Sequence, residues 1–363
     1  MKRKLVGDKI LLWTVCGALL FGSAALTFFP AARMSERENR ILAELPTPSA
    51  ANMADGSYTA GLDTYATERF PFRVPLRAAR AALEIGLGRQ EVGGVLLCTD
   101  GSLCKRITPN GRAYQKNLAA LQDMQHAYGD RLTVAVAPRR IDARAAVLPP
   151  LYDADENAAV WDTLAGSLPH AVTFPALTAD AHWYRTDHHW TTLGAYEAYL
   201  QLGGVLGYTP YAETDFRAET VSKNFLGTSD AAAGLPRISP DSIQLYRYEG
   251  DGAYTVKKDG KATPFAGVYD MEKLQTRDQY AVFFGGNCGF LEITYSENRP
   301  TLLLIKDSFA NALLPFLARH YRVIALDPRY CADGIEAYAR SADRILCLMG
   351  MQTLCTTVIF KSV

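Results

Sequence analysis

The chain lacks several patterns that would assign it to a familiar functional class. Its 38 Lys and Arg residues balance its 38 Asp and Glu residues, so nucleic-acid binding, which needs a basic surface, is not expected. None of the seven cysteines forms a C-x-x-C pair, and the six histidines include no H-x-x-x-H or H-E-x-x-H spacing. A zinc ribbon and a helical zinc-hydrolase motif are therefore not expected.

Internal repeats and low-complexity tracts are also absent, and no motif indicates a cofactor, so we expect none. The 363 residues are 48% hydrophobic and 21% charged, which is enough for one large domain or two ordinary ones with a sizeable core. Cys98 and Cys104 flank a turn-forming Thr-Asp-Gly sequence. They can bridge only if the loop is long enough, and free buried thiols are the alternative.

The N-terminus has the pattern of an exported protein. Residues 10–29 contain no charged side chain, and the basic residues before them are Lys2, Arg3, Lys4 and Lys9. About 20 apolar residues cross a bilayer core, and preceding basic residues favour a cytoplasmic N-terminus. We expect residues 1–30 to form a cytoplasmic tail and a single-pass membrane anchor, with a cleavable signal peptide as the alternative. Either one places the remainder outside the cytoplasm.

The rest of the chain divides into a connecting region and a larger domain. Residues 31–110 predict a polar stalk, a helix over 74–87 and a hairpin over 92–103, all packing on the core. Residues 111–363 predict an α/β domain. It contains a helix over 112–128 and continuous apolar runs at 131–137, 301–305, 323–326 and 344–349.

Continuous apolar runs separated by helical lengths are typical of parallel strands that helices cover on both faces. They predict a three-layer fold with a mostly parallel, flavodoxin-like sheet. Residues 208–300 do not fit this pattern, because they are rich in turns and short alternating pieces such as 280–284 and 291–295. We expect this region to form an irregular, antiparallel insertion.

Two segments together supply the parts of a Ser-His-Asp nucleophilic site. Ser308 follows one of the apolar runs and precedes a helical stretch, so it is expected at the carboxyl edge of the sheet, beside free N–H groups. Asp187 and His189 are two residues apart, and in an extended segment they lie on the same side. His188 would then point away, and Trp190 would pack beneath the site, but both stay candidates for binding the substrate.

Alternative interpretations remain open for these residues. Ser308, or Asp307 before it, could simply cap the following helix. His182, Asp187, His188 and His189 could bind zinc or manganese, or form a structural polar cluster. We expect no metal, because adjacent histidines rarely both reach one ion.

Three other residues are weaker candidates for the site. Gly286 and Asn287 follow an expected strand and could supply an oxyanion N–H and a side-chain amide, or simply form a turn. Arg139 follows another expected strand and could contact an anionic or sugar substrate. A solvated surface position is the alternative for Arg139.

Five short segments, taken in order, resemble the DHHW family of bacterial exported proteins. Residues 186–191 contain the Asp-His-His-Trp sequence that names the family, and the other matching segments are 35–40, 68–73, 285–287 and 306–309. The family in turn resembles the alginate O-acetylation proteins, which have an SGNH-hydrolase-like fold. This resemblance implies that Asp187 is the acid, His189 the base and Ser308 the nucleophile. The Lys-Asp-Ser-Phe context departs from the Gly-Thr-Ser context of the alginate proteins, so the oxyanion geometry stays open.

The resemblance also implies a polysaccharide substrate and a membrane-bound O-acyltransferase partner. We expect an SGNH-hydrolase-like three-layer sandwich that works as a membrane-anchored, extracytoplasmic serine O-acetyltransferase or acetylesterase. The alternative is a non-catalytic exported factor that binds or assembles a polysaccharide with the same fold. In that case some of the 19 Tyr, 15 Phe and 4 Trp residues would stack on sugars.

Overall fold

The computed structural model describes residues 2–28, 33–107, 111–152, 154–249, 253–295, 298–331 and 334–360. The chain forms two compact units. The first is Met1–Arg89 with Gly234–Arg237, and the second is Gln90–Ala233 with Ile238–Val363.

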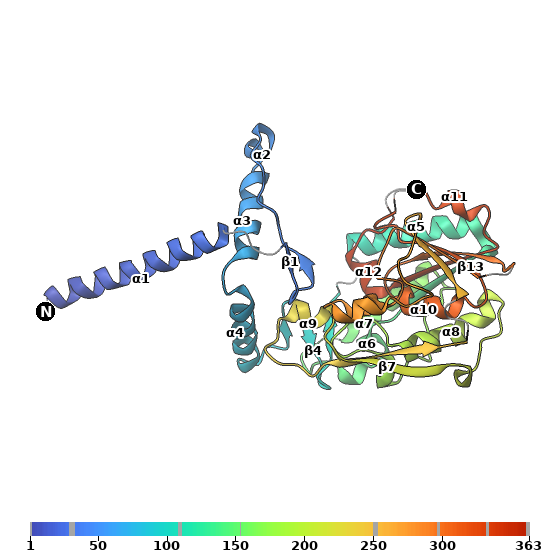
Figure 1. The fold of residues 1–363 in the computed structure, drawn as a ribbon. Helices are drawn as coiled ribbons and strands as arrows, with labels where there is room; N and C mark the ends of the chain where they lie inside the picture. Colours follow the sequence, from blue (N-terminus) through green and yellow to red (C-terminus); the bar gives the residue numbers. More distant parts are fainter. Residues whose placement is uncertain are drawn as a thin grey trace. The chain divides into compact units, whose positions relative to one another are not determined.

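The first unit is mainly helical (Figure 1). Its elements are α1 (Lys2–Phe28), β1 (Met34–Ser35), β2 (Arg40–Ile41), α2 (Ala50–Ala54), α3 (Ser57–Arg69) and α4 (Arg73–Gly86). Helix α1 coincides with the expected anchor, but among the described residues no helix has both the length and the apolar character needed to cross a membrane. The anchor therefore stays a prediction.

Glu38 organises the region around the β1–β2 hairpin. Its carboxylate lies 2.7 Å from Arg40 Nε, 2.7 Å from Arg73 Nε and 3.0 Å from Arg77 Nη1. Burial by itself would raise the pKa of Glu38, but the arginines lower it to about 2. The segment expected to be an irregular stalk is thus tied to α4 by ion pairs.

The second unit is built on a seven-stranded sheet with the order β10-β9-β11-β13-β12-β14-β6. The strands are β6 (Leu132–Ala137), β9 (Thr255–Lys258), β10 (Lys261–Ala262), β11 (Phe290–Thr294), β12 (Thr301–Lys306), β13 (Arg322–Leu326) and β14 (Arg344–Gly350). The four expected strands, β6, β12, β13 and β14, pair in parallel.

The sheet is mixed rather than mostly parallel, which corrects the expectation from the sequence. β11 pairs antiparallel with β13, and β9 and β10 extend the sheet in the same way. These strands come from residues 208–300, so part of the expected insertion continues the main sheet. The 280–284 piece is a 3-10 helix over Gln279–Val282 instead of a strand.

Smaller elements surround this sheet. Three short strands, β3 (Glu91–Val92), β4 (Val95–Leu97) and β5 (Leu103–Lys105), form a sheet, and β7 (Arg217–Phe225) pairs with β8 (Asp241–Arg247). The helices are α5 (Arg112–Tyr128), α6 (Arg140–Ala143), α7 (Ala154–Ser167), α8 (Thr192–Leu206), α9 (Thr228–Ala233), α10 (Ala310–Leu317), α11 (Glu336–Ala339) and α12 (Met351–Thr356). Cys98 and Cys104 are free thiols and do not bridge.

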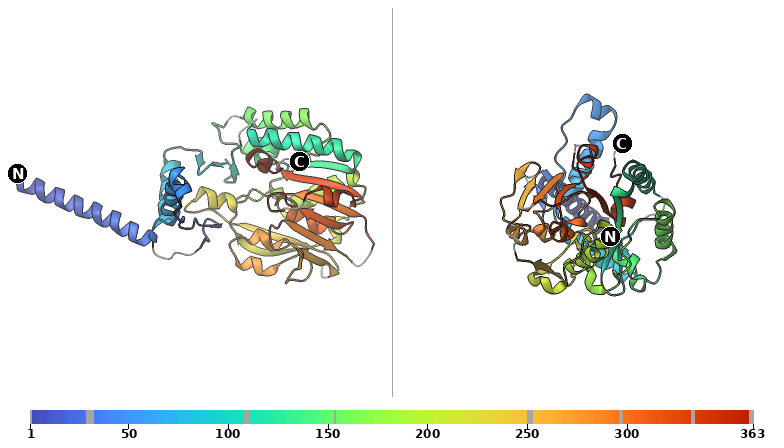
Figure 2. Two further views of the ribbon diagram at one scale, coloured as in Figure 1. Left: turned by 90° about the horizontal axis from the view of Figure 1, so that it is seen from above. Right: turned by 90° about the vertical axis from the view of Figure 1, so that its right-hand side faces the viewer.

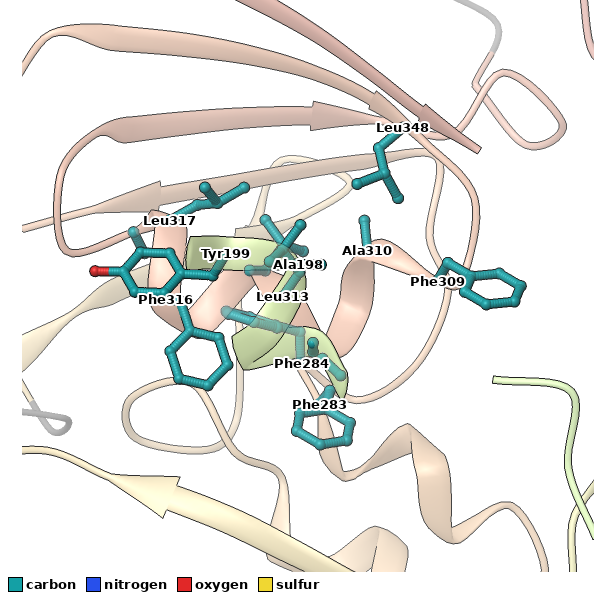
Figure 3. Packing of buried hydrophobic residues seen from close by; sticks show 14 of the residues in the cluster. Ala198, Tyr199, Phe283, Phe284, Phe309, Ala310, Leu313, Phe316, Leu317 and Leu348 are labelled. Carbon is teal, nitrogen blue, oxygen red and sulfur yellow. The ribbon is translucent and has the colours of Figure 1, made fainter. Parts of the chain in front are cut away.

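Helices cover both faces of the sheet, which gives the expected three layers (Figures 1 and 2). Because strand side chains alternate between faces, Leu302 and Leu304 of β12 pack in one hydrophobic core with α8 and α10. Leu303 and Ile305 pack in the other core, with α5 and α12. Figure 3 shows the first core, where aromatic and aliphatic side chains of α8 and α10 meet. This packing fixes the position of α10, and Ser308 lies in the turn just before it.

Candidate active site

Ser308 lies in the turn between β12 and α10, at the carboxyl edge of the parallel strands. The Asp307 carboxylate shapes this turn, because it accepts hydrogen bonds from the N–H groups of Phe309 and Gly350, both at 2.9 Å. No side chain caps α10. Ser308 Oγ is bonded to His189 and does not cap the helix, whereas Asp307 does accept a backbone N–H next to the start of α10.

Ser308, His189 and Asp187 form one continuous line of hydrogen bonds. Ser308 Oγ lies 2.8 Å from His189 Nε2, and His189 Nδ1 lies 2.5 Å from Asp187 Oδ1. A general base must lie within hydrogen-bond reach of the proton that it takes, and His189 does. Since an ionised carboxylate only accepts, Nδ1 carries the imidazole proton, and Nε2 accepts from the Ser308 hydroxyl. All three residues are buried.

The surroundings of Asp187 keep it ionised. Burial alone would raise its pKa, but the neighbouring imidazoles of His189 and His188, with hydrogen bonds from His189 and Thr228, lower the pKa far below the usual range. Thr228 donates to Oδ2 through both its N–H, at 2.7 Å, and its hydroxyl, at 2.9 Å. Gly227 packs against the same side chain so closely that a Cβ there would lie 2.2 Å from the Asp187 Cβ.

The segment that carries Asp187 and His189 is a tight turn, not an extended strand. Trp183 and Trp190 form an antiparallel bridge around it, and the His189 N–H donates to Asp187 Oδ1 at 3.0 Å. Asp187 and His189 meet, as expected. However, the expectation that His188 points away is wrong, because the turn brings its ring centroid within 3.8 Å of the His189 ring centroid.

Two aromatic residues hold the histidine and serine segments together. Trp190 is fully buried, and its Nε1 donates to the Phe309 carbonyl at 2.9 Å, which agrees with its expected place beneath the site. The Tyr280 ring stacks on His189 with centroids 4.1 Å apart and planes 6° apart. The Tyr280 hydroxyl also donates to the Ser308 carbonyl at 3.2 Å.

Sequence reasoning missed Thr228 and Tyr280. Both are far from Asp187 and Ser308 in the chain, and neither belongs to a recognisable motif. The aromatic content of residues 280–284 was the only signal for Tyr280, and it indicated a strand.

The oxyanion candidates Gly286 and Asn287 differ in whether their N–H groups already have hydrogen-bond acceptors. The Gly286 N–H donates to the Phe283 carbonyl at 3.1 Å, so this expected oxyanion donor is already engaged. Asn287 is exposed and accepts through Oδ1 from Asn311 Nδ2 at 3.1 Å. Within the described part of the chain, the Asn287 amide nitrogen and the Ser308 backbone N–H have no hydrogen-bond acceptor. These two groups remain as donors.

A buried lysine supports this arrangement. Lys306 is 1% exposed, and its Nζ donates to Asn311 Oδ1 at 2.8 Å. That bond fixes the Asn311 amide so that its nitrogen faces Asn287. Lys306 thus orients Asn287 through Asn311.

Arg139 does not have the solvated position considered for it. It is 3% exposed, and its guanidinium donates to Asp142, to Asn157 and to the Lys105 carbonyl. With these partners Arg139 stabilises the fold, and the structure gives it no contact with Ser308 or His189.

Asp187, His188 and His189 are also the one set of described residues that could hold a metal ion, since one ligand atom from each lies within 4.8 Å of the others. His189 uses Nδ1 for Asp187 and Nε2 for Ser308. It could ligate an ion only by giving up one of these bonds. His182, the fourth residue considered, is instead bonded through Nδ1 to the Ala179 N–H at 3.3 Å.

Comparison with known proteins finds that part of this chain is similar to one family. The model of the DHHW protein family matches residues 176–326, a range that includes Asp187, His189 and Ser308. The expected resemblance to this family is confirmed. A search of curated proteins with the sequence gave no match.

Two solved structures share the fold, and a third is less similar. A DHHW family protein from Eubacterium siraeum is 22% identical, with a TM-score of 0.61, over 74% of this chain and 94% of that chain. Bacillus cereus PatB1 with a sulfonyl adduct is 18% identical, with a TM-score of 0.58, over 74% and 100%. The O-acetyltransferase domain of Pseudomonas putida AlgJ is 16% identical, with a TM-score of 0.44, over 73% and 93%.

Proposed function

We propose that this protein is a serine enzyme that transfers acyl groups, most simply acetyl, to or from hydroxyls of an exported or cell-surface polysaccharide. The observation that carries the proposal is the hydrogen-bonded line from Ser308 through His189 to Asp187. The match to the DHHW family model over the same residues supports it, as does the resemblance of that family to the alginate O-acetylation proteins.

The proposed chemistry follows from the protons of the site. His189 Nε2 takes the Ser308 proton as Oγ attacks the acyl carbonyl carbon, and returns it to the leaving group. Asp187 stabilises the imidazolium that forms. The Ser308 N–H and the Asn287 amide would donate to the oxyanion. A sugar hydroxyl that then attacks the acyl-enzyme makes the reaction a transfer, and water makes it hydrolysis.

The location and partner are also proposals. The basic residues and the uncharged run at the N-terminus favour a protein that is anchored in the cell membrane and works outside the cytoplasm. A membrane-bound O-acyltransferase partner would supply acyl groups from the cytoplasmic side.

Nitrophenol release from p-nitrophenyl acetate tests the proposal. The full chain should release nitrophenol, and Ser308→Ala and His189→Ala should each lower kcat by on the order of 10³-fold or more. His170→Ala, which changes an exposed histidine, is the control and should match the wild type. Release that is equal in all four proteins would contradict an enzyme acting through Ser308, and would favour the non-catalytic binding role.

A further inference from the structure

The proton on His188 is assigned by its neighbour Thr228. Thr228 Oγ1 lies 2.9 Å from Asp187 Oδ2, and the ionised carboxylate can only accept. The single hydroxyl proton therefore lies on that bond. His188 Nδ1 is 2.7 Å from Thr228 Oγ1. Because the hydroxyl proton is already used, Nδ1 must donate the hydrogen bond between them. Neutral His188 thus carries its proton on Nδ1 and a lone pair on Nε2.

The two imidazoles of the site face the same way. Nδ1 of His189 and Nδ1 of His188 lie 2.5 Å and 3.6 Å from the same oxygen, Asp187 Oδ1. The rings are 3.8 Å apart between centroids and tilted by 38°. In an imidazole the Nε2 lone pair points roughly opposite to the Nδ1–H bond. His189 Nε2 therefore points from Asp187 towards Ser308 Oγ, and His188 Nε2 points away from Thr228, which is itself bonded to Asp187.

The Nε2 atom of His188 is available to a ligand. The side chain is 19% exposed. Among the described residues Nε2 has no hydrogen-bond partner, and it does not belong to the buried atoms that lack one. Burial and the neighbouring His189 lower the pKa of His188 to about 4, so the ring is neutral at pH 7. An accessible lone pair beside the nucleophile accepts a hydrogen bond from an O–H or N–H group.

We propose that His188 Nε2 binds a second hydroxyl of the acyl acceptor, next to the hydroxyl that attacks. This inference rests on the proposed function. During transfer the attacking oxygen bonds to the acyl carbon and gives its only proton to His189 Nε2. The bond from that carbon to Ser308 Oγ then breaks, and the proton returns to Ser308. A sugar hydroxyl that attacks has no proton left for His188, but a neighbouring ring hydroxyl does.

The site would therefore select vicinal diols, which are the arrangement on a sugar ring. The test uses the full chain, p-nitrophenyl acetate as the donor, and two acceptors of similar shape, cis-1,2-cyclohexanediol and cyclohexanol. We expect the acetylation rate per hydroxyl to be about tenfold higher for the diol, because one additional hydrogen bond changes a rate by about that factor. His188→Phe keeps the ring but should abolish this preference, and His188→Gln should restore part of it through its amide oxygen.

The outcomes separate this inference from the proposed function. Equal use of the two acceptors by the wild type, a preference that survives in His188→Phe, or acylation of Ser308 without transfer to either alcohol would each overturn it. Absence of any Ser308-dependent nitrophenol release would overturn the proposed function itself.

The assigned proton can be checked without activity. Nitrogen-15 NMR of histidine-labelled protein at pH 7 should show His188 protonated on Nδ1. His188→Phe identifies the resonance, since the signal disappears in that variant. Protonation on Nε2 would contradict the inference.

Discussion

At the residue scale, Asp187 has two tasks that its hydrogen bonds distinguish. Oδ1 accepts from His189 Nδ1 and from the His189 N–H, which orients the imidazole. Oδ2 accepts twice from Thr228, which orients the carboxylate. The negative charge is kept because the histidines and these donors outweigh the effect of burial.

Replacing this charge should slow the reaction without removing the site. In Asp187→Asn we expect kcat for nitrophenol release to fall by on the order of 10³- to 10⁴-fold, because an amide neither stabilises the imidazolium nor selects its tautomer. KM should change little. Asp123→Asn, on the exposed face of α5, is the matched control. A loss below about tenfold would show that Asp187 is not the partner of a catalytic base.

The residue pairing could be predicted from the sequence only in part. The two-residue spacing indicated that Asp187 and His189 meet, and they do. The extended backbone assumed for that step is wrong, since the bridge between Trp183 and Trp190 closes a turn. That is why His188 was misplaced. The contact with Thr228 depends on tertiary folding, which spacing alone does not contain.

At the scale of elements, the loop before α9 supports the site. Gly227 lies against the Asp187 Cβ, its N–H donates to Thr186 Oγ1 at 3.0 Å, and Thr228 follows it. This loop therefore sets the position of the carboxylate from the side opposite to His189.

A methyl group at Gly227 should displace Asp187. We expect Gly227→Ala to lower kcat by about 100-fold or more and to destabilise the protein by about 1–3 kcal/mol, because the new Cβ overlaps a buried side chain. Gly204→Ala in α8 is the control, since a Cβ added there would have no neighbouring atom within 4 Å. It should be neutral or stabilising by under about 1 kcal/mol. Thermal unfolding measures the stability and nitrophenol release measures kcat. Similar values for the two variants would contradict the role of Gly227 in positioning Asp187.

In the first unit, the Glu38 ion pairs predict a dependence on pH. The folded pKa of about 2 lies below the unfolded value of about 4.3. The stabilisation is therefore complete above that unfolded value and is lost as the pH falls towards 2. Glu38→Gln should lower the local opening free energy by about 1–3 kcal/mol at pH 7, after allowance for solvent screening, and by almost nothing near pH 2. Hydrogen exchange of the β1, β2 and α4 amides measures this. Equal effects at both pH values would contradict the assignment.

Across the whole molecule, the sequence predicted the parallel strands of the sheet better than the antiparallel ones. The strands β6, β12, β13 and β14 are continuous apolar runs because both of their faces are covered. β11 alternates between buried and half-buried residues, and nothing in its pattern distinguishes a strand of the main sheet from one of a separate insertion. Its pairing with β13 is decided by the fold.

The sheet also explains how segments so distant in sequence make one site. β12 presents Ser308 at its carboxyl end, and the turn before α8 presents His189. The Trp190 indole joins the two through the Phe309 carbonyl. Helices α8 and α10 pack on the same face of the sheet (Figure 3), so the distance between base and nucleophile is set by the core.

The most direct test of the central claim is to trap the acyl group on the chain. The full chain is mixed with p-nitrophenyl acetate, quenched in acid within the first turnover, and mapped by peptide mass spectrometry. An acetyl group on Ser308 that is absent in Ser308→Ala and strongly reduced in His189→Ala is the predicted result. Acetylation that is confined to lysines, or that is unchanged in His189→Ala, would contradict a Ser308–His189 acyl-transfer site.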